Sequence, residues 1–344
     1  MEITMDLERS PLTFAEAINE GIRQYMELDE DTYVFGQLAD SKAGIFGTTT
    51  GLVDDFPGRV YDFPIAEGLM HATGLGMALR GKRSIMCHQR IDFMAPGLDA
   101  LINWLGLWYF KSGAGNKGEI PVTIRAVVGR GWGQAPQHSK NLTPLLATIP
   151  GLIIYCPSNP RDAKGMMIAA INSQAPAIVI EHRSLFDNTQ DVPQEPYSAE
   201  HCPRRLLSGH HLTVVSVGDL VCDCLKVFNT DEYAGYIDLY DLRMIKPLGG
   251  AGFQMIRESA FKTGRLLVIE PMWSEFGIAG EILAQVMDGE QAEIRFMRLG
   301  YPQGYTPMSA ANEFAFYPSC KTIMETADRM LDADRWVNIY QDDS

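Results

Sequence analysis

No stretch of this chain approaches the roughly 20 consecutive apolar residues that a membrane-spanning helix requires. The nearest, residues 100–110, is interrupted by Asn103. The first nine residues are acidic and lack the basic region followed by an apolar one that marks a secretory signal. The sequence therefore predicts a cytoplasmic protein without membrane association.

Positive charge is also scarce, with 29 Lys and Arg against 43 Asp and Glu and a formal net charge of −14. A surface of this sign repels nucleic acid and anionic lipid, so neither is expected as a partner. The chain has only six cysteines, with neither the density of a disulfide framework nor C-x-x-C metal spacing. No repeat, coiled coil or low-complexity tract is present.

What the chain does have is a repeated alternation of short apolar strands with helical segments. Its 344 residues suggest two domains, and an apolar content of 46% is ordinary for a soluble globular protein. A capping box at Thr13 and Glu16 predicts the start of a first helix. Strands are expected at 33–36, near Val60, and at 84–87, 121–127, 152–155 and 177–181, with helices near 67–79, 97–111, 141–148 and 160–173.

The rhythm breaks between 184 and 209, where Pro and polar residues accumulate, and then resumes. Strands are expected again at 212–217, 236–240, 265–270 and 294–299, with helices near 219–229, 250–262, 276–288 and 319–331. Such alternation predicts an α/β fold with two doubly wound domains and largely parallel sheets. We place the domains at 10–185 and 209–335, joined by a linker at 186–208.

One stretch, residues 62–79, combines a strand end, a Pro-limited turn, a single carboxylate and a helix rich in small residues. The carboxylate is Glu67, and apolar surroundings would disfavour its charged form. Its apolar neighbours in sequence are Phe63, Pro64, Ile65, Leu69 and Met70. From the residues alone, the commoner explanation is a helix N-terminal carboxylate favoured by the helix dipole.

Several motifs in a fixed order decide between these explanations. They are Gly36 to Leu52, Arg59 to Glu67, Ala135 to Ser139, Pro150 to Leu152, Pro157–Ser158 with Asp162 to Gly165, Asp241 to Arg243 with Pro247–Leu248, and Gly264 to Glu270. Together they resemble the β subunit of the thiamine diphosphate-dependent 2-oxoacid dehydrogenases, the pyruvate and branched-chain E1 family, over nearly the whole chain. The resemblance implies a transketolase-like pyrimidine-binding domain followed by a transketolase C-terminal domain.

The resemblance also implies roles for individual residues. Glu67 would hydrogen-bond N1′ of the cofactor aminopyrimidine and so promote the imino tautomer that deprotonates the thiazolium carbon. His138 would lie over the reacting centre and assist the 2-oxoacid or acyl transfer, although a lone His in a Gly-rich loop is more often structural. Phe93 would stack on the aminopyrimidine, for which an ordinary core aromatic is an equal alternative. Gln89 would line the pocket, and the backbone of Ile65 would contact the pyrimidine.

The chain departs from the family at four positions, three of them within residues 87–90. Gln37, near the cofactor, and Cys87 stand where the family often has Glu, and His88 and Arg90 are more polar than usual. If Arg90 pointed into the site it would favour an anionic or phosphorylated substrate, but a solvated Arg is the ordinary expectation. Side chains around 163–175 that accompany a potassium ion in some relatives are replaced, so no such ion is expected.

The Gly-Asp-Gly and later Asn that hold Mg²⁺ and the diphosphate in this superfamily are missing. The nearest match, Gly218-Asp219-Leu220, lacks the second Gly. This chain is therefore expected to supply no metal ligand. A separate α subunit would hold Mg²⁺ and the diphosphate in an α2β2 heterotetramer that could pass an acyl group to a lipoyl acyltransferase.

Two other functions stay open at the level of sequence. The polar residues at 87–90 are compatible with a two-chain transketolase-like or carboligating synthase that uses the same cofactor without lipoamide. A non-catalytic partner that lost activity is a third possibility, against which the presence of both Glu67 and His138 counts.

Overall fold

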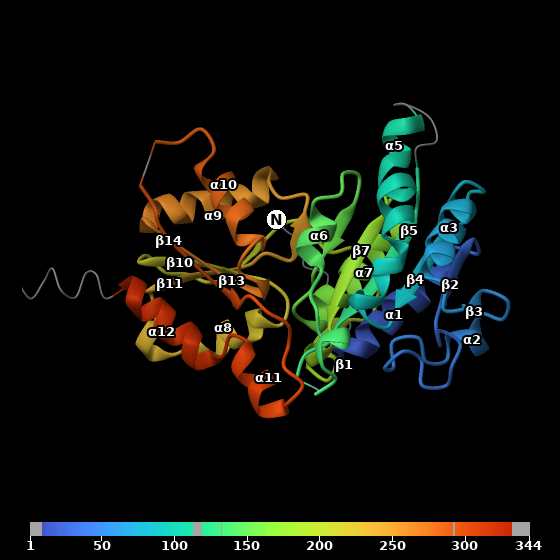
Figure 1. Ribbon diagram of the computed structural model, residues 1–344, viewed down its shortest axis with the longest axis horizontal. Coiled ribbons are helices and arrows are strands. Elements are labelled where there is room, and N and C mark those ends of the chain that lie inside the picture. Colours follow the sequence, from blue (N-terminus) through green and yellow to red (C-terminus); the bar gives the residue numbers. More distant parts are fainter. Residues whose placement is uncertain (1–8, 113–118, 132, 292, 332–344) are drawn as a thin grey trace, which may run out of the picture. The chain divides into compact units, whose positions relative to one another are not determined.

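The computed structural model describes residues 9–112, 119–131, 133–291 and 293–331 (Figure 1). The chain divides into two compact units, one formed by residues up to 130 together with 137–200, and the other by 131–136 together with the residues from 201 onward. In the described ranges no helix is long and apolar enough to cross a membrane.

The N-terminal unit is built on a parallel sheet with the strand order β6-β7-β5-β4-β2-β3. The strands are β2 (Thr32–Gly36), β3 (Val60–Asp62), β4 (Arg83–His88), β5 (Val122–Val128), β6 (Ile153–Tyr155) and β7 (Ala177–His182). Every residue of β5 and β7 is buried, as expected for inner strands covered on both faces.

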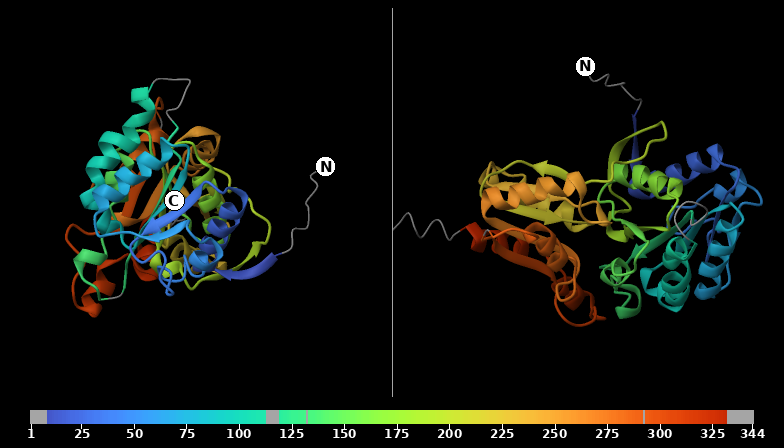
Figure 2. Two further views of the ribbon diagram at one scale, coloured as in Figure 1. Left: turned by 90° about the vertical axis from the view of Figure 1, so that its right-hand side faces the viewer. Right: turned by 90° about the horizontal axis from the view of Figure 1, so that it is seen from above.

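Helices and short turns connect these strands (Figures 1 and 2). They are α1 (Phe14–Leu28), α2 (Leu52–Asp55), α3 (Glu67–Ala78), η1 (Ile91–Gly97), α4 (Leu98–Ala100), η2 (Leu101–Leu105), α5 (Gly106–Ser112), η3 (Pro136–His138), α6 (Thr143–Ala147), α7 (Pro160–Asn172) and η4 (Arg183–Leu185). The capping box is confirmed, because Thr13 and Glu16 bond each other's backbone N–H groups at the start of α1.

The C-terminal unit has a second sheet with the order β14-β13-β10-β11-β9, in which only the edge strand β9 is antiparallel. Its elements are β9 (Arg204–Leu207), β10 (Leu212–Ser216), α8 (Leu220–Phe228), η5 (Asp231–Tyr233), β11 (Ile237–Asp241), β12 (Met244–Lys246), α9 (Gly250–Thr263), β13 (Arg265–Trp273), α10 (Ala279–Met287), β14 (Arg295–Tyr301), α11 (Ala310–Phe316) and α12 (Cys320–Leu331). A core of buried side chains from β10, β11, β13, α8 and α12 stabilises it.

The predicted α/β class and the predicted strands and helices are confirmed, with a few differences. The segment predicted as one helix at 97–111 is broken into η1, α4, the single π-helical turn η2 and α5, with Pro96 inside η1. Helices α2 and α11 and strand β12 were not predicted. Within the predicted linker 186–208 lie β9 and β8 (Thr189–Pro193), which pairs with β1 (Arg9–Thr13), so the proposed domain bounds stay a prediction.

Candidate active site

Three of the predicted site residues follow the carboxyl ends of three neighbouring parallel strands. Gln37 follows β2, Glu67 follows β3 after the turn at Pro64, and Gln89 follows β4. In open α/β sheets this edge is where ligands bind. The side-chain amide of Gln89 donates to the Gln37 carbonyl oxygen over 3.1 Å, and that of Gln37 donates to the Pro64 carbonyl oxygen over 3.1 Å. These bonds tie the three strand ends together.

Glu67 is the first residue of α3, where the helix dipole favours a carboxylate. Its side chain is half-buried, and Met70 below it is buried. The expected apolar enclosure is only partly present in this chain, because Ile65 is 86% exposed and Leu69 is 59% exposed. Ile65 lies in the turn before the helix and Leu69 on its outer face, so both side chains stand beside Glu67 on the surface.

Phe93 and His138 meet although 45 positions separate them in sequence. Their rings lie 5.6 Å apart in an edge-to-face arrangement at 83°. Next to them, Lys140 donates to Asp92 from its backbone N–H and its ammonium group, both over 3.2 Å. Phe93 is partly buried, and its role as a stacking aromatic stays a prediction.

The glycines before His138 are explained by contacts within the protein. A Cβ on Gly129 would lie 2.2 Å from the His138 carbonyl oxygen, so only glycine allows this approach. In the C-terminal unit, the N–H groups of Gly131 and Gly133 both donate to the buried Glu313 carboxylate over 2.7 Å. These glycines therefore allow close backbone packing at Gly129 and form a carboxylate clamp at Gly131 and Gly133.

A buried histidine pair lies one helical turn after Glu67, and no motif in the sequence predicted it. His71 is one turn after Glu67 in α3, and His88 ends β4. Their Nε2 atoms are 2.8 Å apart, and His71 Nδ1 is 2.9 Å from the Gly97 carbonyl oxygen. Burial lowers the pKa of His71, and burial together with the neighbouring ring holds the pKa of His88 well below its usual range. Both rings are therefore neutral at pH 7.

A second buried polar group lies on the opposite face of β4. Arg125 donates to both Glu181 carboxylate oxygens over 2.7 Å, to Thr48 Oγ1 over 2.6 Å and to Cys87 Sγ over 3.5 Å. The Arg125 and Glu181 side chains are 1% and 0% exposed. Burial opposes the charge, but the attraction to Glu181 outweighs it and raises the pKa of Arg125. The sequence signal that could have indicated this ion pair is one basic residue in β5 and one acidic residue in β7, two strands that are otherwise mostly apolar.

Arg90 is buried, so the expectation of a solvated side chain is wrong. It is 4% exposed, its guanidinium lies 4.9 Å above the Phe46 ring, and burial lowers its pKa to about 10. A Cβ on Gly129 would lie 3.3 Å from Arg90 Nε as well as against His138. The guanidinium is therefore adjacent to the backbone of the His138 loop.

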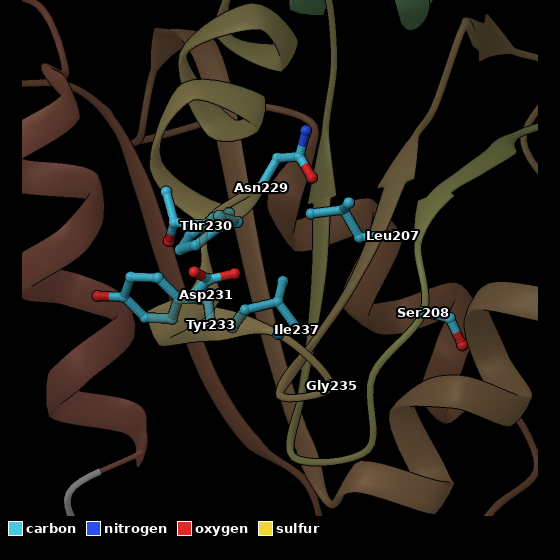
Figure 3. A pocket seen from close by; sticks show the side chains of 10 residues that line it. Leu207, Ser208, Asn229, Thr230, Asp231, Tyr233, Gly235 and Ile237 are labelled. Carbon is cyan, nitrogen blue, oxygen red and sulfur yellow. The ribbon is translucent and has the colours of Figure 1, made fainter.

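One pocket of about 290 Å³ lies in the C-terminal unit, between β9, the end of α8 and the start of β11 (Figure 3). Its lining includes Leu207, Asn229, Asp231 and Ile237, and none of the predicted site residues. Among the described residues, no group of three or more His, Cys, Asp or Glu side chains is arranged to hold a metal ion. All six cysteines fall within the described part of the chain, and none forms a disulfide.

Comparison with known proteins identifies the class first. Residues 10–188 match the family model described as the transketolase pyrimidine binding domain, and residues 204–323 match the transketolase C-terminal domain. A solved structure described as a split gene transketolase, inactive beta4 tetramer, superposes with a TM-score of 0.76 at 17% identity, covering 93% of this chain and 98% of that chain. The chain thus has the transketolase-like two-domain fold.

The family within this class follows from sequence identity. The pyruvate dehydrogenase E1 component subunit beta of Bacillus subtilis (strain 168) is 32% identical over 327 residues, which are 93% of this chain and 99% of the relative. The subunit of the same name from Staphylococcus epidermidis (strain RP62A) is 31% identical with the same coverage. The chain belongs to this E1 β-subunit family, and the resemblance drawn from its motifs is confirmed.

Proposed function

We propose that this chain is the β subunit of a thiamine diphosphate-dependent 2-oxoacid decarboxylating dehydrogenase, an oxidoreductase active together with an α subunit. The observation that carries the proposal is the meeting of Gln37, Glu67 and Gln89 at one sheet edge. The contact of Phe93 with His138 adds to it. Membership of the E1 β family supports the reaction class.

The residues present fit the aminopyrimidine half of the cofactor. The partly buried Phe93 offers a ring for stacking, the exposed turn at Ile65 offers backbone, and Gln89 and Gln37 offer amide groups at the same edge. When bound, thiamine diphosphate supplies the carbanion that attacks the 2-oxoacid and stabilises the charge left by decarboxylation. Glu67 holds a proton at the pyrimidine N1′ position, and His138 donates to or accepts from the substrate oxygen during acyl transfer.

An α subunit completes the proposed site. It would hold Mg²⁺ and the diphosphate, because this sequence lacks the Gly-Asp-Gly and later Asn that bind them in the superfamily. Ile65 and Leu69, exposed beside Glu67, are the apolar surface that such a partner would cover. We propose an α2β2 heterotetramer in the cytoplasm that passes its acyl group to a lipoyl acyltransferase.

The test is co-purification with a candidate α chain, followed by screening 2-oxoacids for decarboxylation with an artificial electron acceptor. Glu67→Gln should lower kcat by about 10²–10⁴, the usual contribution of one acid–base group. The matched control is Glu27→Gln, an exposed carboxylate on α1, which should leave kcat unchanged. Wild-type activity of the Glu67→Gln complex would refute the proposed role and favour a non-catalytic β chain.

A second candidate is a two-chain transketolase-like or carboligating synthase without a lipoyl acceptor. The buried Arg90 beside the His138 loop is the observation behind it, because a guanidinium there suits a phosphorylated substrate. The same screen separates the two functions. Oxidation of pyruvate or a branched 2-oxoacid supports the dehydrogenase, whereas carbon–carbon bond formation without oxidation supports the synthase.

A further inference from the structure

The hydrogen-bond directions in the buried histidine pair are fixed by chemistry. A carbonyl oxygen only accepts, so His71 Nδ1 carries a hydrogen and donates to Gly97. In a neutral imidazole the other nitrogen is then an acceptor, so the single hydrogen between the two Nε2 atoms belongs to His88. The chain of donors runs from His88 to His71 to the Gly97 carbonyl oxygen.

This chain of bonds closes a loop that carries predicted cofactor residues. His88 and Gly97 are the two ends of a ten-residue segment that contains Gln89 and Phe93, and His71 bonds to both ends. His71 itself lies one helical turn after Glu67. The ring thus connects the helix that begins with Glu67 to both ends of the segment that bears Gln89 and Phe93.

The pair is buried and closely packed. His71 is 0% exposed and His88 is 1% exposed, with their rings edge to face at 5.0 Å and 82°. A Cβ on Gly97 would lie 2.5 Å from His71 Nδ1 and 3.2 Å from the Glu67 carbonyl oxygen. Gly97 therefore touches both the ring and the backbone of Glu67, so a shift of the ring moves the first turn of α3.

We propose that His71 and His88 are positioning residues, a tautomer-locked pair that sets Glu67 against Gln89 and Phe93. This inference rests on the proposed function, since it concerns how the proposed cofactor residues are held. Neither histidine contacts the reacting atoms. Their action is to fix the distance between the helix start and the strand end.

A matched pair of amides tests the proposal. The Nε2 of a glutamine at position 88 falls near the imidazole Nε2, so His88→Gln can still donate to His71. The amide of an asparagine falls near the imidazole Nδ1, so His88→Asn cannot. In the reconstituted complex, we expect His88→Asn to lower kcat about tenfold. A small misplacement of reacting groups can lower the rate by up to about 10²-fold, so this loss is of the expected size. KM for the 2-oxoacid should change less than about twofold, and His88→Gln should recover most of the loss.

A measurement without activity accompanies the kinetics. Histidine-selective ¹⁵N labelling of the full chain should show His71 as the Nδ1–H tautomer and His88 as the Nε2–H tautomer. In His88→Gln, His71 should keep its tautomer. His210→Gln, an exposed histidine of the C-terminal unit, is the control for loss of an imidazole and should leave both kcat and the two signals unchanged.

The outcomes separate this inference from the proposed function. Equal kcat for the His88→Asn and His88→Gln complexes, or an Nε2–H tautomer at His71, would overturn the positioning pair even if Glu67→Gln is inactive. An active Glu67→Gln complex would instead remove the proposed function, while the tautomer signals would still report the pair. If His88→Asn does not fold, His88→Phe takes its place, because it keeps a ring of similar size without a donor.

Discussion

Replacing Glu181 by Gln is the most informative perturbation of the N-terminal unit, because it removes one charge of a fully buried pair and keeps the shape. Arg125 and Glu181 are 1% and 0% exposed and are joined by two bonds of 2.7 Å. In the variant, a guanidinium would stay buried without a counter-charge. Breaking such a pair from one side costs about 3–5 kcal/mol.

For a cooperative unit of this size, that loss corresponds to a fall in Tm of roughly 10 °C, since 1 kcal/mol moves the Tm by about 2–4 °C. Urea unfolding followed by circular dichroism measures the free energy, and a thermal scan measures the Tm. Glu325→Gln, in the exposed ion pair with Lys321 on α12, is the control and should cost about 0–1 kcal/mol. A loss below about 1 kcal/mol for Glu181→Gln would refute the reasoning about burial.

The neighbouring Cys87 allows a compensation test. Its Sγ lies 3.5 Å from Arg125 Nη1, so a carboxylate at this position would lie beside the guanidinium. Combining Cys87→Glu with Glu181→Gln would return a carboxylate to the same guanidinium from β4 instead of β7. We expect the double variant to recover part of the stability lost in Glu181→Gln, whereas Cys87→Glu alone should destabilise because it adds an unpaired buried charge.

Three further predictions concern pH and the loop before His138. Because burial lowers the pKa values of His71 and His88 in the folded state, the unfolded chain binds more protons, and the free energy of unfolding should fall as pH drops below 6.5. A variant with Phe at both positions should show a flatter acid limb in urea titrations. Burial raises the pKa of Glu270 from 4.5 to about 8, so its folded state binds more protons. Stability should therefore decline between pH 4.5 and 8, and Glu270→Gln should remove that slope. Glu313→Ala leaves two glycine N–H groups without their acceptor, at a cost of about 1–3 kcal/mol each, and hydrogen exchange at those amides should accelerate; unchanged exchange would contradict the clamp.

The sequence predicted the fold well wherever a segment had one dominant periodicity. The apolar runs of β5 and β7 and the capped start of α1 are strong local signals, and the structure has these elements within a residue or two. The broken helix after Pro96 was missed because a 3₁₀ and a π-helical turn share the composition of an α-helix. Strand β8 was missed because a two-stranded ribbon with β1 has no buried face pattern.

For the candidate site too, the sequence predicted some features and could not predict others. Motif order predicted Glu67, His138 and Phe93 as site residues, but only the tertiary fold brings Phe93 to His138. The enclosure of Glu67 could not be judged from its neighbours in sequence, because Ile65 and Leu69 face outward in the chain by itself. Burial of Arg90 was equally inaccessible, since it depends on a ring at position 46 that lies far away in sequence.

The departures at positions 87 and 88 now have a common explanation in the pleat of β4. Successive side chains of a strand point to opposite faces, so Cys87 meets Arg125 on one face while His88 meets His71 on the other. Gln89 follows directly after these two residues, whose side chains are both held by buried hydrogen bonds. A change on either face would therefore displace Gln89, and the bond from Gln89 to the Gln37 carbonyl would pass the displacement to β2. The two buried polar groups are thus expected to be energetically coupled, and a double-mutant cycle between Glu181→Gln and His88→Asn should give a coupling free energy of about 0.5 kcal/mol or more.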